Sequence, residues 1–506
     1  MKTWLPRLLV SALMASTAMA SAAVAAPPTG AWVFDETPDM PGFTRIIVSE
    51  QNGQYSGTVT SHWYGDLPLK DIYIDGDKLS FHLFNGNMRV PEYPITLTKD
   101  GDRIRMKGQV WDAIFDLPAH SGSDSEVKAL DFPTFPLPAP RTVKAMVPGA
   151  TPPMGWSSWN KFATDIDDKT VRQIADSLVS SGLRDAGYVY VNIDDGWQGQ
   201  RDQDGVLQPN AKFPDMKALA DYVHSRGLKL GIYTSPGPKS CAGYEGSYGH
   251  VEQDAKTYAD WGIDYLKYDL CSGEAFYHTP ETVRAVYQQM GEAIVAAGRP
   301  IMYSLCEYGR FDVGSWGRDV GGSLWRTTGD IEDKYATMAT IGFDKNGVPN
   351  HTGPGGWNDP DMLEVGNGGM SFDEYKTHMS LWSLMAAPLM LGNDVRTMTP
   401  ETLSLLTNRE VLAIDQDKAG AQGLPAKKDG TTEIWTKKLA DGSTAVGVFN
   451  RGEADANVAV TWSELGLKPA KIRDVWNHAD LKADKGYALV VPKHGVVLLK
   501  VVPAKS

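Results

Sequence analysis

The spacing of apolar and polar residues changes twice along the chain. From residue 30 to about 117, short runs of alternating apolar and polar residues are separated by Asn-Gly or Asp-Gly dipeptides, at positions 52–53, 75–76, 85–86 and 100–101. These dipeptides favour tight turns between antiparallel strands. The pattern predicts a small antiparallel β-domain over residues 30–117, either a sandwich or a barrel.

A proline-rich segment follows, and then a second pattern begins. Residues 118–150 contain "FPTFPLPAPRTVKAMVPGA", which predicts a stiff, extended linker. From residue 151, short apolar runs such as "YVYVNI" (188–193), "LKLGIY" (228–233) and "PIMYSL" (300–305) alternate with amphipathic helical stretches. This alternation is typical of parallel βα units. Its length of about 260 residues favours a (β/α)8 TIM barrel over residues 151–412 rather than an open sheet.

The third pattern occupies the end of the chain. Residues 413–506 return to strand-like runs, including "EIWTKKL", "TAVGVFN" and "GVVLLKVV", with Asp-Gly pairs at 429–430 and 441–442. They predict a C-terminal antiparallel β-sandwich. The expected fold class is therefore multidomain α/β plus all-β: a small β-domain, a TIM barrel and a β-sandwich.

The first 25 residues are expected to be removed. Lys2 and Arg7 precede an apolar stretch that ends in the small residues Ala23, Val24 and Ala25, as in a secretory signal peptide. The protein is therefore predicted to be exported to the periplasm or the medium. No later apolar run approaches the roughly 20 residues that a membrane span needs, so no span is expected.

Charge and cysteine content limit the possible binding partners and the number of disulfides. The formal net charge of −13 argues against nucleic acid as a partner. Export allows disulfides to form. The chain has three cysteines, Cys241, Cys271 and Cys306, so at most one bridge can form and one thiol remains.

Ionisable and aromatic residues recur where the predicted barrel strands end. Lys267 and Asp269 are two residues apart, so they lie on one face of their strand. Taken alone, this pair is more simply explained by a strand that ends in solvent. However, six predicted strand ends share the feature, and the active site of a TIM barrel lies at that end. The residues concerned are Asp194, Asp195, Tyr233, Lys267, Asp269, Glu307, Arg326, Asp330, Asp359 and Asp361.

The residue types at these strand ends favour chemistry by carboxylates alone. The sequence has no HExxH, paired CxxC, phosphate-binding glycine loop or G-x-S-x-G motif, so neither a metal nor a cofactor is expected. His378 lies on a predicted helix and is interpreted as a structural or surface residue. Paired carboxylates without a cofactor are characteristic of glycoside hydrolysis.

Seven segments, in order over residues 151–425, resemble glycoside hydrolase family 27, the α-galactosidases: "TPPMGWSSWNKF", "NIDDGW", "LGIYTSPG", "ADWGIDYLKYDLC", "YSLCEYG", "WRTTGDI" and "GPGGWNDPDMLEVGN". The resemblance implies exo-acting hydrolysis of terminal α-galactosyl residues of an oligosaccharide or polysaccharide, with retention of configuration. It implies that Asp269 is the nucleophile and Asp330 the general acid and base. Lys267 is expected to favour the ionised form of Asp269 by about one to three pKa units.

The resemblance also assigns the remaining site residues. Asp194 and Asp195 would hold the 4- and 6-hydroxyls of the sugar, and Arg326 and Asp361 its 2- and 3-hydroxyl side. The other implied substrate-binding residues are Trp159, Tyr233, Lys267, Glu307, Tyr308 and Met362. Cys241 and Cys271 match the family's disulfide beside the nucleophile, which leaves Cys306 unpaired. The role of the N-terminal β-domain is not implied.

Three positions depart from the common family pattern. Gly196 replaces a cysteine, Tyr308 replaces a tryptophan and should make one sugar-stacking wall smaller, and Gly329 precedes Asp330 and should loosen the backbone there. Related enzymes act on α-N-acetylgalactosaminides, β-L-arabinopyranosides or isomaltose-type glucans. Glu307 is taken to argue against the first, and the Asp194–Asp195 pair against the second and, more weakly, the third. A non-catalytic carbohydrate-binding protein would need these acids to be replaced.

Overall fold

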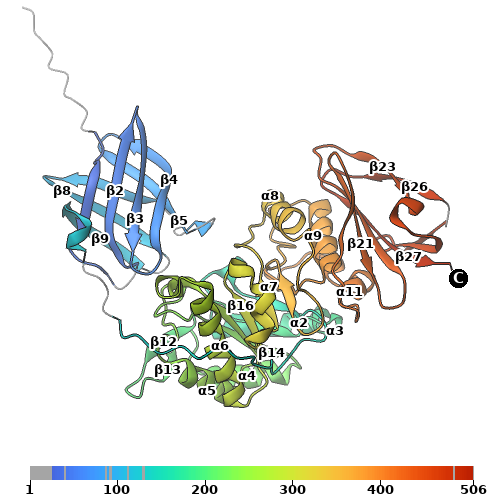
Figure 1. The fold of residues 1–506 in the computed structure, drawn as a ribbon, viewed down its shortest axis with the longest axis horizontal. Coiled ribbons are helices and arrows are strands. Elements are labelled where there is room, and N and C mark those ends of the chain that lie inside the picture. The colour runs from blue at the N-terminus through green and yellow to red at the C-terminus, as the bar shows by residue number, and fades with distance from the viewer. Residues whose placement is uncertain are drawn as a thin grey trace, which may run out of the picture.

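The structure is a computed structural model that describes residues 26–38, 41–85, 88–89, 94–110, 113–127, 132–482 and 485–504. Three folded units follow one another along the chain (Figure 1). The predicted signal peptide, residues 1–25, lies outside the described residues. Among those that are described, no helix is both long enough and apolar enough to cross a bilayer.

The N-terminal unit is a closed antiparallel barrel. Its strands pair in the order β4-β3-β2-β1-β9-β8-β7-β5, and β4 also pairs with β5, which closes the ring. Strand bounds are β1 (Gly30–Phe34), β2 (Phe43–Gln51), β3 (Gln54–Ser61), β4 (Gly65–Asp75), β5 (Lys78–Asn85), β6 (Met88–Arg89), β7 (Ile95–Asp100), β8 (Arg103–Val110) and β9 (Ala113–Ser121). Between β2 and β3, Asn52 and Gly53 both have positive φ, the conformation that an Asn-Gly hairpin turn requires. Of the two expected architectures, the structure is the barrel.

The proline-rich segment lies against the central unit instead of bridging open solvent. Val143 pairs with Val320 in an isolated parallel bridge. The Arg141 backbone N–H donates to Gln288, and the side chain of Ser323 donates to the Val147 carbonyl at 2.6 Å. These contacts fix the segment between Arg141 and Val147, whereas residues 118–121 belong to β9 and extend the N-terminal unit beyond the predicted boundary at 117.

The central unit is the predicted TIM barrel. Eight parallel strands pair in the order β18-β17-β16-β15-β14-β11-β10-β19, and a parallel bridge between Leu363 and Leu391 joins the two ends of this order. The strands are β10 (Met154–Ser157), β11 (Tyr190–Asn192), β14 (Lys229–Thr234), β15 (Tyr265–Asp269), β16 (Met302–Cys306), β17 (Leu324–Arg326), β18 (Trp357–Asp359) and β19 (Leu389–Leu391). A hairpin, β12 (Gln198–Arg201) and β13 (Leu207–Pro209), follows β11.

Helices cover the outside of this barrel. In α2, Asp167 caps the first turn, and the buried residues Val171, Ile174 and Leu178 recur at helical spacing against the strands. The helices are α1 (Trp159–Phe162), α2 (Asp168–Ser180), α3 (Leu183–Ala186), α4 (Met216–Ser225), α5 (Val251–Trp261), α6 (Pro280–Ala297), α7 (Val313–Trp316), α8 (Tyr335–Ala339), α9 (Phe372–Met385), α10 (Pro400–Leu406) and α11 (Arg409–Asp415). A π-helical turn, η5 (Thr340–Lys345), continues α8.

The C-terminal unit is a β-sandwich. One sheet has the order β20-β21-β22-β27-β24-β25, and the other is the pair β23-β26. Strand bounds are β20 (Leu424–Asp429), β21 (Thr432–Lys438), β22 (Thr444–Asn450), β23 (Ala456–Thr461), β24 (Pro469–Asp474), β25 (Ala479–Leu481), β26 (Gly486–Val491) and β27 (Val496–Pro503). The predicted boundary at residue 412 falls inside α11. The expected combination of fold classes is confirmed.

Candidate active site

A pocket opens at the carboxyl ends of the barrel strands. It is lined by Trp159, Asn160, Asp194, Asp195, Tyr233, Cys241, Lys267, Asp269, Tyr308, Arg326, Asp330, Asp361 and Met362. Among the predicted catalytic and substrate-binding residues, only Glu307 does not line this pocket. Side chains separated by up to 203 positions meet here because the ends of parallel barrel strands converge.

Asp269, the last residue of β15, is 3% exposed. The Tyr308 hydroxyl donates to its Oδ1 at 2.6 Å, and Lys267 Nζ lies 3.8 Å from its Oδ2. Burial raises the pKa of Asp269 to about 6, although Lys267 and the Tyr308 hydrogen bond act in the opposite direction. The expected effect of Lys267 is therefore present, but desolvation of the carboxylate is larger.

Lys267 lies closer to a second carboxylate than to Asp269. Its Nζ is 3.0 Å from Asp194 Oδ2. Burial lowers the pKa of Lys267, but the carboxylates of Asp194 and Asp269 outweigh this effect and raise it well above its ordinary value. Lys267 therefore stays charged, and it places one cation between two acids on neighbouring parts of the pocket wall.

Asp195 is 1% exposed and is held by backbone N–H groups. The Ala242 N–H donates to Oδ2 at 2.7 Å, and the Gly196 N–H donates to Oδ1 at 2.9 Å. Burial raises the pKa of Asp195 to about 7, and these two donors oppose that rise. Gly196 has φ +105°, in the region that favours glycine, so the glycine that replaces the family cysteine suits its backbone.

Arg326 joins the two acids on the other side of the pocket. It is 2% exposed, and its Nη2 lies 3.0 Å from both Asp330 Oδ1 and Asp361 Oδ2. Asp361 Oδ2 also accepts the Ile331 N–H at 2.8 Å, and Asp361 has φ +86°. A non-glycine residue in this conformation is strained, and its surroundings hold it there.

A wider cleft lies next to this pocket. It has a volume of about 540 Å³ and is lined by Tyr308, Thr327, Thr328, Gly329, Asp330, Glu332, Ala336, Thr337, Thr340, Ile341 and Lys345. Tyr308 and Asp330 line both cavities. Asp330 therefore stands at the boundary between a narrow, strongly polar pocket and an open cleft over α8 and η5.

The comparison with known families decides the classification. Residues 151–417 match the family model described as "Alpha galactosidase A", and residues 429–501 match the alpha-galactosidase C-terminal β-sandwich domain. The chain belongs to the alpha-galactosidase family. The resemblance inferred from the sequence motifs is confirmed.

Relatives of this family match most of the chain. An alpha-galactosidase from Cyamopsis tetragonoloba is 48% identical over 338 residues, which cover 65% of this chain and 81% of the relative. The structure of alpha-galactosidase I from Mortierella vinacea aligns with a TM-score of 0.67 and 34% identity, covering 70% of this chain and 98% of that one. A Bacteroides fragilis structure of the alpha-galactosidase/melibiase type has a TM-score of 0.68 and 30% identity, and covers 95% of this chain and 96% of that one. The last alignment therefore extends into the N-terminal barrel.

Glu307 lies outside the pocket that the other predicted substrate-binding residues line, whereas His378 has one of the two roles expected for it. Glu307 is fully buried behind the pocket wall, where it accepts the Gly309 N–H and where burial raises its pKa to about 8. Glu307 does not line the pocket, and the argument from it against an acetamido substituent stays a prediction. His378 is buried, and its Nε2 accepts the Glu364 N–H at 3.1 Å, so of the two expectations for it the structural role applies.

The structure also shows the surroundings of Tyr308 and Gly329, two of the positions that depart from the common family pattern. Tyr308 was expected to provide only a smaller wall, but its hydroxyl contacts the Asp269 carboxylate. A Cβ at Gly329 would meet no atom within 4 Å, so space does not require glycine there. Asn160 lines the pocket and donates to Glu364, although it was not among the predicted site residues. Its position directly after Trp159 in the "GWSSWN" segment was the available signal.

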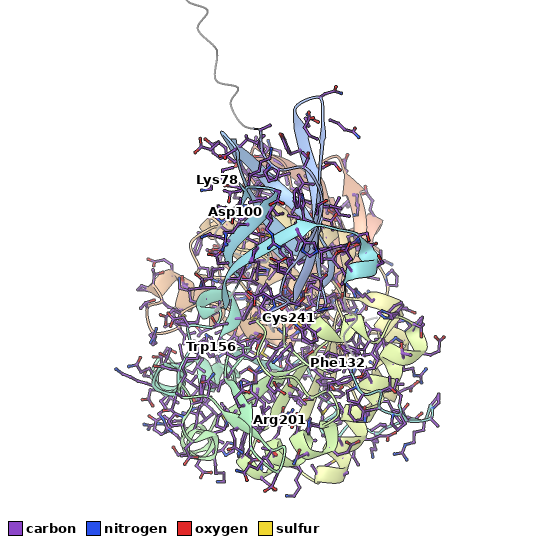
Figure 2. The ribbon with its side chains drawn as sticks, turned by 90° about the vertical axis from the view of Figure 1, so that its left-hand side faces the viewer. Lys78, Asp100, Phe132, Trp156, Arg201 and Cys241 are labelled. Atoms are coloured by element: carbon purple, nitrogen blue, oxygen red, sulfur yellow. A yellow bond between two sulfur atoms is a disulfide. The ribbon has the colours of Figure 1, made fainter. Side chains whose placement is uncertain are left out.

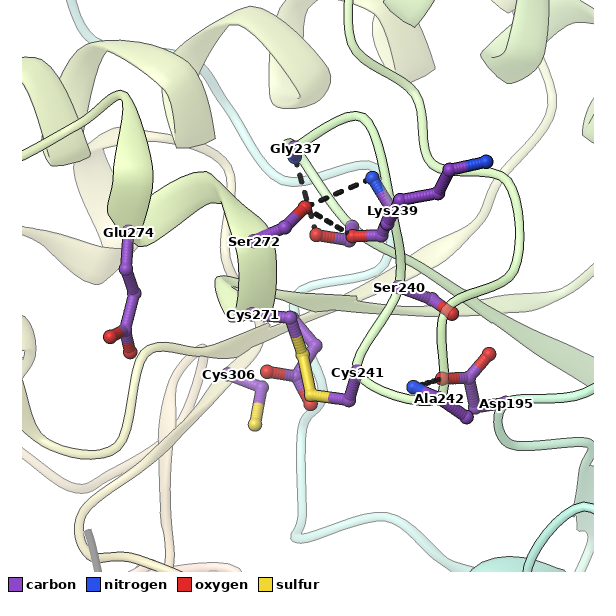
Figure 3. Close-up of a disulfide and its surroundings, with 12 residues drawn as sticks. Asp195, Gly237, Lys239, Ser240, Cys241, Ala242, Cys271, Ser272, Glu274 and Cys306 are labelled. Atoms are coloured by element: carbon purple, nitrogen blue, oxygen red, sulfur yellow. Dashed lines mark hydrogen bonds between the residues drawn. A yellow bond between two sulfur atoms is a disulfide. The ribbon is translucent and has the colours of Figure 1, made fainter. Parts of the chain in front are cut away.

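Cys241 forms a disulfide with Cys271, which lies two residues after Asp269 in the chain, and Cys306 is a buried free thiol (Figure 3). Among the described residues, Cys241, Asp269 and Cys271 form one group close enough to be considered for a metal ion. Its two sulfurs are bonded to each other and are not thiolate ligands. This group therefore offers a metal only the Asp269 carboxylate.

Proposed function

We propose that this member of the family removes terminal α-galactosyl residues with retention of configuration, with Asp269 as the nucleophile and Asp330 as the acid and base. The observation that supports these roles most directly is the position of the two carboxylates. Asp269 lies deep in the narrow pocket, and Asp330 lies where that pocket meets the wide cleft. We therefore assign the polar pocket around Asp269 to the galactosyl residue and the cleft to the leaving group.

In the first step, the Asp269 carboxylate attacks the anomeric carbon, and the bond from that carbon to the leaving oxygen breaks. Asp330 gives its proton to this oxygen. In the second step, Asp330 takes a proton from water, the water oxygen attacks the same carbon, and Asp269 is released. Two inversions at one carbon retain its configuration.

The surrounding residues prepare Asp269 for this chemistry. A nucleophilic carboxylate must be ionised, and burial alone disfavours its charge. Lys267 and the Tyr308 hydroxyl both lower the pKa of Asp269 against this effect. Their combined action keeps a useful fraction of Asp269 ionised near neutral pH while the carboxylate stays largely free of water.

The polar wall of the pocket provides specificity for the sugar. We assign Asp194 and Asp195 to the 4- and 6-hydroxyls, and Arg326 and Asp361 to the opposite side of the ring. All four are buried, so a sugar without the matching hydroxyl would leave a charged group without its partner. Trp159, Tyr233 and Met362 supply the remaining, less polar walls.

A set of four p-nitrophenyl glycosides tests this assignment: α-galactoside, α-N-acetylgalactosaminide, β-L-arabinopyranoside and α-glucoside. We expect the α-galactoside to have the highest kcat/KM. Asp269→Asn should remain folded and lose at least about three orders of magnitude in kcat, because it lacks the nucleophile. A higher kcat/KM for another glycoside, or a folded Asp269→Asn protein with most of its activity, would contradict the proposal.

We also propose that the protein is exported and acts on α-galactoside oligosaccharides or polysaccharide side chains outside the cytoplasm. Two features support export: the signal-like sequence of residues 1–25 and a cysteine pair in disulfide geometry. Mass spectrometry of the protein recovered from cell fractions should show a mature chain that begins near residue 26. An intact first 25 residues on cytoplasmic protein would contradict this proposal.

A further inference from the structure

The N-terminal barrel contacts the catalytic domain at a loop that reaches the active site. The turn between β3 and β4 carries Trp63 and Tyr64, which are only 4% and 9% exposed. The Trp63 ring lies 5.4 Å from that of Phe132, and Phe132 lies 5.5 Å from Phe276 of the catalytic domain, centroid to centroid. In Figure 2, Cys241 lies where the two units meet.

A single peptide group connects Tyr64 to Asp195. The Tyr64 hydroxyl donates to the carbonyl oxygen of Cys241 at 2.6 Å. The N–H of the same peptide, which belongs to Ala242, donates to Asp195 Oδ2 at 2.7 Å (Figure 3). Because a peptide group is planar, a bond that orients its carbonyl also orients its N–H. Hydrogen bonds in such a chain also polarise one another.

A turn also shapes this loop: the Gly243 N–H donates to the Ser240 carbonyl at 3.1 Å across the Cys241–Ala242 peptide, and Tyr64 adds a side-chain hydrogen bond to the carbonyl of that peptide. The disulfide ties Cys241 to Cys271, two residues after Asp269. The Cys241 N–H lies 3.4 Å from the Tyr233 hydroxyl, a long hydrogen bond. These contacts restrain the Cys241 side chain and its preceding peptide. Among the described residues, Tyr64 is the side chain that contacts the carbonyl of the following peptide.

The electrostatics agree with this connection. Burial, followed by the nearby Asp195 carboxylate, raises the pKa of Tyr64 well above its ordinary value. The hydroxyl therefore keeps its proton and remains a donor at any pH at which the enzyme works. The Ala242 N–H in turn opposes the rise that burial causes in the pKa of Asp195.

We propose that Tyr64 is a positioning residue of the active site: the N-terminal barrel orients the Cys241–Ala242 peptide and thereby holds Asp195 against the sugar. This inference rests on the proposed role of Asp195 in binding a sugar hydroxyl. It gives the N-terminal barrel a function in galactose binding, so the barrel is part of the catalytic assembly. The leaving-group cleft is not involved, because Tyr64 does not line it.

The test compares full-length wild type with Tyr64→Phe and with the control Tyr73→Phe. Tyr73 lies on β4 of the same barrel and is 67% exposed. We expect Tyr64→Phe to raise the KM for p-nitrophenyl α-galactoside about three- to tenfold and to change kcat by less than about twofold, because Asp195 would contact a hydroxyl remote from the bond that breaks. The control should match wild type.

Inhibition by free galactose distinguishes an effect of Tyr64 on galactose binding from an effect on the leaving-group side. Galactose has no leaving group, so its Ki should rise by the same factor as KM. A raised KM with an unchanged Ki would place Tyr64 on the leaving-group side and overturn the inference. An unchanged KM and Ki, or a kcat below about a tenth of wild type, would also overturn it. If wild type hydrolyses α-galactosides normally, these results leave the proposed function standing, whereas an inactive wild type would overturn both.

Discussion

Tyr308 shows how one residue can change the chemistry of a site while its family motif stays recognisable. The sequence indicated a smaller ring than the usual tryptophan, and therefore a smaller wall. The structure places the phenol hydroxyl 2.6 Å from Asp269 Oδ1. An indole has an N–H donor but no hydroxyl, whereas this tyrosine places an O–H donor on the carboxylate and thereby lowers the pKa of Asp269.

Tyr308→Phe should therefore move the acidic limb of the kcat/KM profile to higher pH. Without the hydroxyl, the pKa of Asp269 rises above about 6, so a smaller fraction is ionised at mildly acidic pH. We expect a larger loss of kcat/KM at pH 5 than at pH 8. Tyr335→Phe is the matched control, because the buried hydroxyl of Tyr335 has no hydrogen-bond partner among the described residues. An acidic limb that does not move would contradict this role.

Asp330→Ala should affect substrates according to their leaving groups. Melibiose and raffinose need a proton on the leaving oxygen and should lose most activity, whereas the first step with a nitrophenyl galactoside should largely survive. Azide needs no general base, so it should restore turnover and give an α-galactosyl azide. Product configuration can be read by NMR. A β-azide, or equal losses without rescue, would show that Asp330 is not the acid and base.

At the scale of elements, the periodicity was sufficient for barrel strands such as β11, β14 and β16, but not for β10 and β19 or for the contacts between strands. Lys267 and Asp269, which the sequence placed at a strand end, lie on β15, Tyr265–Asp269, and the last residue of this strand is the proposed nucleophile. The Lys267–Asp269 pairing follows from strand alternation alone. That Lys267 lies closer to Asp194, and that Glu307 lies behind the pocket wall, depends on contacts between distant strands. Local pattern carries no information about such contacts.

The loop after β14 gives a prediction about covalent structure. Cys241 on this loop meets Cys271 after β15, while Cys306 at the end of β16 is buried and free. Peptide mapping of the oxidised protein should find Cys241 linked to Cys271. Cys306 should react with an alkylating agent only after denaturation, because it is fully buried. A bridge that contains Cys306 would mean that the loop after β14 is placed wrongly.

At the scale of the whole molecule, the three units are joined by buried contacts. Tyr64 extends the N-terminal barrel to the Cys241 carbonyl. In the C-terminal sandwich, the buried Lys437 donates to the carbonyls of Ser383 and Ile414 in the catalytic domain. The sequence predicted the order and the class of the units, because each has its own periodicity. It could not predict these contacts, since a lone tyrosine on a hairpin turn does not show what covers it.

Buried acids of the catalytic domain should make the protein less stable as the pH rises. Burial raises the pKa of Asp269 to about 6, of Asp195 to about 7 and of Glu307 to about 8, from ordinary values of 3.8 for aspartate and 4.5 for glutamate. The folded state therefore binds more protons than the unfolded chain between about pH 4 and 8. The stabilisation that these protonated acids provide is complete below their ordinary pKa values. It is lost as the pH rises through their pKa values in the folded state.

We expect the melting temperature, measured by calorimetry at one scan rate, to fall from pH 6 to pH 8. Over this range each such acid removes at most about 1.4 kcal/mol of unfolding free energy per pH unit. The buried His378, whose pKa burial lowers to about 3, acts in the opposite direction, but only below about pH 6.5. Glu307→Gln cannot ionise, so its melting temperature should fall less over this range, whereas the exposed control Glu36→Gln should follow wild type. A wild-type melting temperature that rises from pH 6 to pH 8, or equal slopes for Glu307→Gln and wild type, would show that these buried acids do not control stability.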